Sequence, residues 1–241
     1  MSDGTANVST DGAPTTFVLI PGAGADPRVY GATIAALRDL GHDGIAPPLP
    51  LDEATATPSD HADAIVAALP DPPPAPLVVV GQSLGAYSAT IAAACLRPSR
   101  LILLAPMIPA LGESAGDWWE GTGHGEAIAP LTQRLGSPSE WDEEAMAEVF
   151  YHDVDPAALA ASAEYEGVPS RGLFEEPLPL AAWPDVPTTV LAPREDRMFP
   201  LEFQRRVARE RLGVEVEEMD GGHLPFLSRP RDLAARLIEL A

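Results

Sequence analysis

The stretch that decides the fold is LVVVGQSLGAYS, residues 77–88. A run of apolar residues leads to Ser83, which stands between Gly81 and Gly85, and small residues follow. The β-branched run predicts a buried strand, and the small residues after it predict a helix. A G-x-S-x-G pattern between a strand and a helix places its serine at the tip of a sharp turn. The context therefore predicts that Ser83 is a nucleophile, although the five residues alone also fit an ordinary turn.

A serine hydroxyl is a weak nucleophile and needs a base within hydrogen-bond reach. His223 is the expected base, because GGHLPF lies between the last predicted strand and the last predicted helix. A loop at that place returns the imidazole to the edge of the sheet. The other histidines are expected to be solvated or structural, although the glycine-rich loop around His124 leaves a substrate contact open there. These others are His42, His61, His124 and His152.

The base needs an acid that orients the imidazole and stabilises its protonated form. TTVLAPREDRMFP, residues 188–200, places Glu195 and Asp196 just beyond another predicted strand. We expect Asp196 to be this acid, because its D-x-x-x-P approach to the following helix puts it in the loop. Glu195 stays open as the alternative.

Short apolar runs alternate with helical patterns along most of the chain. The runs that predict strands lie at 16–20, 43–47, 77–81, 100–105, 188–192 and 213–219. The helical patterns lie at 27–40, 58–69, 84–96, 201–212 and 230–240. Nearly continuous apolar strands separated by helices are typical of a mostly parallel sheet covered on both faces. The predicted fold class is therefore α/β.

Residues 107–180 interrupt this alternation with helical patterns of their own. An insertion of this size between two strands predicts a helical cap, which can close over a pocket and exclude water. Residues 1–13 are polar and are expected to form a disordered tail. The remaining 14–241 are expected to form one domain.

Composition limits the partners. The formal net charge is −21, and all 15 basic residues are arginines. This excess of acid disfavours binding to nucleic acid or to an anionic membrane, because no basic patch neutralises phosphates. The lone Cys95 rules out an intrachain disulfide and a cysteine metal cluster, and its apolar surroundings predict core packing. With no membrane-spanning apolar run and no signal-peptide pattern, a cytoplasmic protein is expected.

The order Ser83, Asp196, His223 is the order of the triad in α/β hydrolases. Across roughly 16–241 the sequence resembles that superfamily. FVLIPGAG, GQSLGA and GGHLPFLSRP resemble, more narrowly, the plant methylesterase and hydroxynitrile-lyase group and its bacterial relatives. The resemblance implies the α/β-hydrolase fold and an oxyanion hole made by the backbone N–H groups of Ala23 and Leu84. For Ala23, a flexible connection after the first strand is the alternative.

The chain departs from that group's pattern at two places, and it differs from the lyases at a further one. Pro21 stands where a histidine usually precedes glycine, and Gln82 replaces the common histidine before the serine, so both are expected to shape the pocket wall. Leu224 stands where the lyases carry a lysine, and this chain has no lysine at all. Hydrolysis is therefore favoured over cyanide chemistry.

The expected reaction is hydrolysis of a small or medium apolar ester through an acyl-enzyme on Ser83, with no metal or organic cofactor required. Four aromatic residues of the insertion are candidates to line an apolar substrate pocket, and packing between cap and core is the alternative for each. They are Trp118, Trp119, Phe150 and Tyr151. Two other functions stay open: a thioesterase or other acyl-processing enzyme with the same triad, and a ligand-binding protein with little turnover.

Overall fold

A computed structural model describes residues 13–165 and 167–241. In this part of the chain one parallel sheet has the strand order β2-β1-β3-β4-β5-β6. The strands are β1 Thr16–Ile20, β2 Asp43–Ile45, β3 Leu77–Gln82, β4 Arg100–Leu104, β5 Thr188–Pro193 and β6 Glu217–Met219. The predicted α/β class with a parallel sheet is confirmed. The predicted tail lies outside the described residues except for Ala13.

Strands β1 and β3 are buried along their whole length, because helices cover both faces of the sheet. All six residues of β3 are buried, as expected for a parallel strand inside such a sheet. Alternate side chains enter different cores: Val79 packs in one hydrophobic cluster and Val80 in the other. This alternation explains why the sequence of β3 is continuously apolar up to Gly81.

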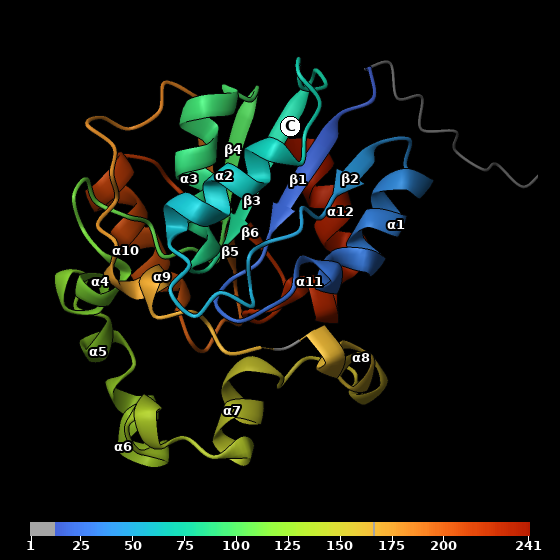
Figure 1. Ribbon diagram of the computed structural model, residues 1–241. Helices are drawn as coiled ribbons and strands as arrows, with labels where there is room; N and C mark the ends of the chain where they lie inside the picture. The colour runs from blue at the N-terminus through green and yellow to red at the C-terminus, as the bar shows by residue number, and fades with distance from the viewer. Residues whose placement is uncertain (1–12, 166) are drawn as a thin grey trace, which may run out of the picture.

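The helices divide between the two faces (Figure 1). On one face lie α2 Pro58–Ala67, α3 Gly85–Leu96 and α10 Leu201–Leu212, whose apolar residues join the same cluster as Val79. On the other face lie α1 Gly31–Asp39 and α12 Pro230–Leu240, whose residues join the cluster of Val80. None of the helices within 13–165 and 167–241 is long and apolar enough to cross a membrane.

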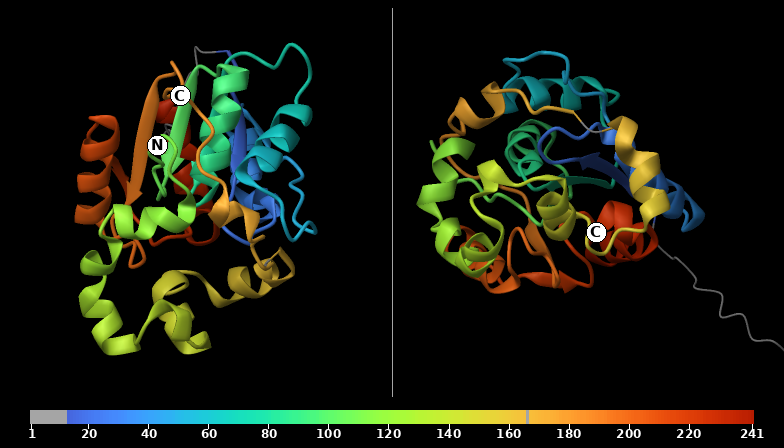
Figure 2. Two further views of the ribbon diagram at one scale, coloured as in Figure 1. Left: turned by 60° about the vertical axis from the view of Figure 1, so that its left-hand side comes forward. Right: turned by 90° about the horizontal axis from the view of Figure 1, so that it is seen from below.

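Residues 107–180, which we call the 107–180 segment, connect β4 to β5 and carry short helices. These are α4 Ala115–Gly121, α5 His124–Ala127, α6 Ala129–Leu135, α7 Glu143–Phe150, α8 Pro156–Ser162 and α9 Gly172–Glu175. Figures 1 and 2 show α5 to α8 beyond the carboxyl ends of the strands, on the side where Ser83 leaves β3. The segment therefore lies over the edge where parallel α/β sheets bind their ligands.

The predicted boundaries differ from the observed ones mainly at the margins of the sheet. The strand expected at 213–219 begins only at Glu217, and the one expected at 43–47 ends at Ile45. Each of these edge strands pairs with one neighbour only, so fewer residues are drawn into the ladder. Cys95 corrects a second expectation: it is exposed near the end of α3 instead of buried in the core.

Candidate active site

Ser83 occupies a strained turn between β3 and α3. Its φ is 51°, in the left-handed region that non-glycine residues rarely adopt. The turn is held by hydrogen bonds of 3.0 Å from Ser83 N to Leu104 O and from Met107 N to Ser83 O. A Cβ on Gly85 would collide with the carbonyl oxygen of Pro21. The glycine of the motif is therefore required by the close approach of the loop after β1.

His223 and Asp196 come together although they lie on different loops. His223 Nδ1 is 2.8 Å from Asp196 Oδ2, and both side chains are almost completely buried. Asp196 Oδ1 accepts hydrogen bonds from Met198 N at 2.9 Å and Phe199 N at 2.8 Å. A carboxylate held in this way fixes the tautomer of the imidazole, with the proton on Nδ1 and the lone pair on Nε2.

Ser83 and His223 both line one cavity. In the described part of the chain no hydrogen bond joins their side chains, and catalytic hydrogen bonds often tighten only when substrate binds. The ring of His223 lies between two aromatic side chains, with centroids 5.4 Å from Phe150 and 5.0 Å from Phe199. These rings limit the positions that the imidazole can take.

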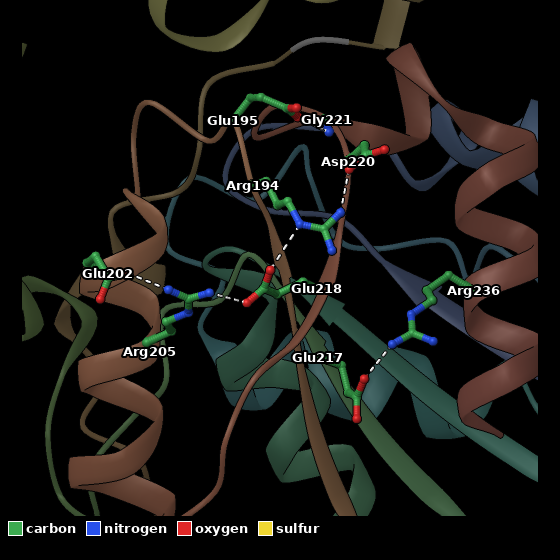
Figure 3. Close-up of polar contacts among 9 residues, drawn as sticks. All are labelled: Arg194, Glu195, Glu202, Arg205, Glu217, Glu218, Asp220, Gly221 and Arg236. Carbon is green, nitrogen blue, oxygen red and sulfur yellow. Dashed lines mark hydrogen bonds and ion pairs between the residues drawn. The ribbon is translucent and has the colours of Figure 1, made fainter.

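Glu195, the alternative acid, points elsewhere. Its carboxylate accepts a hydrogen bond from Gly221 N, as Figure 3 shows. Asp220, which is also close to His223 in sequence, pairs instead with Arg194 (Figure 3). Arg194 also pairs with Glu218 on β6, so this network braces the loops after β5 and β6. The acid that contacts the imidazole is therefore Asp196.

The two N–H groups expected to bind an oxyanion belong to residues near Ser83. Leu84 follows Ser83 in the chain, and Ala23 follows Gly22, where an added Cβ would be 2.8 Å from Ser83 Cβ. Both residues line the cavity. Within residues 13–165 and 167–241 neither N–H donates a hydrogen bond to the protein. Both N–H groups are therefore without a protein acceptor within the described residues.

The cavity has a volume of about 430 Å³ and a mainly apolar wall. Of the four candidate pocket residues, Trp119, Phe150 and Tyr151 line it. Trp118 does not: it is fully buried, and its indole N–H donates a 2.9 Å hydrogen bond to Ile108 O. Successive residues of a helix point about 100° apart, so the turn of α4 sends Trp118 into the core and Trp119 toward the cavity.

Two of the histidines expected to be solvated or structural are buried. His124 lies buried at the start of α5, outside the cavity lining, with Nε2 2.8 Å from Met198 O. A carbonyl oxygen only accepts, so Nε2 donates this hydrogen bond, and burial lowers the pKa of His124. His61 is also buried, on α2, and burial lowers its pKa as well. His124 therefore supports the loop of Asp196 instead of reaching a substrate.

Some residues of the site carried no recognisable signal in the sequence. Phe199 packs on His223 and donates its N–H to Asp196, and Asp153 contacts the loop of His223 through Gly222 N. For Phe199 the only hint is its place three residues after the acid. As for a metal, the residues that the structure describes contain no cluster of three or more His, Cys, Asp or Glu suited to hold one.

The sequence was compared with protein families and with known proteins. The model of the Alpha/beta hydrolase family matches residues 17–236. The chain belongs to the α/β-hydrolase family. This α/β hydrolase is 29% identical over 246 residues to Probable hydrolase R7 of Phoma sp., covering 93% of this chain and 97% of that protein.

Solved structures of low sequence identity share the fold of this α/β hydrolase. Polyneuridine aldehyde esterase superposes with a TM-score of 0.76 at 22% identity, covering 95% of this chain and 99% of that one. A pyrethroid hydrolase from Sphingobium faniae JZ-2 gives a TM-score of 0.75 at 22% identity, covering 95% and 97%. The expected fold and the expected assignment to the hydrolases are confirmed.

Proposed function

We propose that this α/β hydrolase is a serine esterase that cleaves small or medium, uncharged apolar esters. The observation that carries the proposal is the 2.8 Å contact between Asp196 and His223 at a cavity that Ser83 also lines. A nucleophile on a strained turn, a base beside it and an acid behind the base form the set that acyl transfer requires. No basic or acidic residue besides these is needed for the chemistry.

The proposed reaction has two stages. His223 Nε2 takes the proton of Ser83 Oγ as Oγ bonds to the ester carbonyl carbon, and the N–H groups of Ala23 and Leu84 stabilise the oxyanion. The intermediate collapses as the bond to the alcohol oxygen breaks, and that oxygen takes the proton from His223. Water then attacks the acyl-enzyme by the same route, with His223 as base, and releases the carboxylic acid and free Ser83.

The cavity supports an uncharged substrate. Among the lining residues that the structure describes, none is Asp, Glu, Arg or Lys. A carboxylate or phosphate brought into it would lose its hydration without gaining a counter-ion, which is costly. The net charge of −21 also repels anions from the molecule as a whole. Both features favour a neutral ester over a thioester of a polyanionic carrier.

The 107–180 segment is proposed to act as the cap of this site. It supplies Trp119, Met146 and Phe150 to the same cavity that Ser83 and His223 line. A wall of this kind excludes water and so strengthens the electrostatic interactions in the site. Substrate selection would then reside in this segment. Its description as a cap and the cytoplasmic location both stay predictions.

The test compares two esters of similar size, p-nitrophenyl butyrate and p-nitrophenyl hydrogen succinate, which carries a carboxylate. We expect the wild type to release p-nitrophenol from the butyrate, with a kcat/KM for the succinate lower by at least about tenfold. Ser83→Ala should show neither turnover nor an acyl adduct by intact mass. Ser88→Ala, the same change in α3 outside the cavity, is the matched control and should behave as wild type.

Equal release by wild type and Ser83→Ala would contradict the proposed nucleophile. Equal use of both esters would contradict the uncharged substrate class but leave the nucleophile in place. Tight binding of an apolar ester without any adduct or product would favour the ligand-binding function instead.

A further inference from the structure

Gln82, the last residue of β3, connects two loops of the site through one side-chain amide. Its Oε1 accepts a 2.7 Å hydrogen bond from Gly22 N, and its Nε2 donates a 3.2 Å hydrogen bond to His223 O. The residue is 1% exposed. Its partners lie 60 and 141 residues away in the sequence, so the amide ties together the two parts of the site that flank Ser83.

The orientation of this amide is determined by its partners. The N–H of Gly22 can only donate, and the carbonyl oxygen of His223 can only accept, so only one placement of the Gln82 oxygen and nitrogen satisfies both. A carboxylate would accept from Gly22 but could not donate to His223. An apolar side chain could do neither. The position therefore requires a group with one acceptor and one donor.

We propose that Gln82 is a positioning residue that holds the proposed oxyanion loop and the loop of His223 at a fixed separation around Ser83. The inference rests on the proposed function and deepens it. Gly22 directly precedes Ala23, whose N–H is a proposed oxyanion donor, and Gly22 lies against Ser83. The bridge thus links the donor side of the site to the base side without touching the reacting atoms.

The geometry explains why such a bridge matters for turnover. Oxyanion donors act only when they lie about 2.7–3.1 Å from the developing charge. A misplacement of about 1 Å can lower the rate by roughly 10²-fold. Asp196 fixes the far side of the His223 ring, but the backbone of His223 and that of Gly22 have no direct hydrogen bond among the described residues. Gln82 supplies the connection between them.

The experiment measures kcat and KM for p-nitrophenyl butyrate in the wild type, Gln82→Leu and Gln82→Glu across a range of pH. Amide hydrogen exchange over residues 20–26 and 220–226 is followed in the same proteins. We expect Gln82→Leu to lower kcat by about 10²-fold with KM nearly unchanged. Exchange in both loops should accelerate together.

The Gln82→Glu variant gives a readout that a general loss of stability would not. A protonated carboxyl has one acceptor and one donor, as the amide has, and burial favours protonation. Its kcat relative to wild type at the same pH should therefore rise toward acidic pH, whereas the ratio for Gln82→Leu should stay flat. Thr90→Val removes a buried hydrogen bond within α3, from Thr90 Oγ1 to Ala86 O, and controls for stability alone.

Wild-type kcat in Gln82→Leu would overturn the positioning role while leaving the Ser83 mechanism in place. A Gln82→Glu ratio that stays as flat as that of Gln82→Leu would also overturn it. If the wild type hydrolyses no ester, the proposed function fails. Coupled acceleration of exchange in both loops would still support the bridge, and unchanged exchange would overturn it. If Gln82→Leu does not fold, the pH response of Gln82→Glu decides.

Discussion

Asp153 Oδ2 accepts a 2.8 Å hydrogen bond from the backbone N–H of Gly222, the residue directly before His223. The neighbouring His152 contacts the carbonyl oxygen of Glu195 through Nε2, at 3.1 Å. Residues 152–153 follow α7 in the 107–180 segment, so this segment is bonded to both loops that carry the Asp196–His223 pair. Its position and the position of the base are therefore linked.

Removing the hydrogen bond between Asp153 and Gly222 should make the loop of His223 more mobile. We expect Asp153→Ala to lower kcat by about tenfold, because the loop of His223 loses a charge-assisted hydrogen bond. Amide exchange over 220–224 should become faster. Asp153→Asn keeps an acceptor oxygen, so its kcat and exchange rate should lie between those of the wild type and those of Asp153→Ala. Glu144→Ala removes an exposed charge from the same segment and should change neither kcat nor exchange. An unchanged kcat and exchange rate in Asp153→Ala would contradict this link.

The neighbouring acids Asp196 and Glu195 offer a matched pair of substitutions. Asp196→Asn should lower kcat by about 10⁴-fold, because an amide opposite Nδ1 stabilises the wrong tautomer of His223. Glu195→Gln should lower kcat by less than about tenfold, because the Glu195 carboxylate holds Gly221 N and not the imidazole. Steady-state kinetics on p-nitrophenyl butyrate distinguish the two. A larger loss in Glu195→Gln than in Asp196→Asn would reverse the assignment.

The two adjacent tryptophans should separate stability from substrate binding. Trp118→Ala should lower the free energy of unfolding by about 3–5 kcal/mol, because a fully buried ring leaves a cavity. Trp119→Ala removes part of the cavity wall and should raise KM for apolar esters with a smaller loss of stability. Urea unfolding and KM measured on both variants test this contrast. Equal stability losses with equal KM values would argue against it.

Buried histidines predict a dependence of stability on pH. Burial lowers the pKa of His61 in the folded state below its usual value of 6.5. Between the folded and unfolded pKa the unfolded chain therefore binds more protons, so stability rises with pH and falls on acidification. We expect Tm to decrease from about pH 8 to about pH 5, with a smaller decrease in His61→Leu. A decrease of the same size in both proteins would show that His61 does not contribute.

Much of the scaffold was accessible from the sequence because its signals are local. The β-branched run before Ser83, the glycines beside it and the small residues after it predict the strand, the turn and the helix within twelve consecutive residues. The apolar runs elsewhere predict the other strands of the sheet in the same way. The predicted ranges of the edge strands β2 and β6 are longer than the observed strands, because the length of an edge strand depends on pairing with its neighbour.

The sequence by itself determined the α/β alternation, the turn at Ser83 and the loops in which the base and the acid are expected. Only the tertiary structure decided that Asp196 and not Glu195 faces His223, that Trp118 packs inward while Trp119 lines the cavity, and that Gln82 spans two loops. Adjacent residues have nearly the same sequence context, but their side chains point in different directions. Which direction meets a partner depends on other chain segments, such as that of His223, 27 residues from Asp196, or that of Gly22, 60 residues from Gln82, and no local pattern records that meeting.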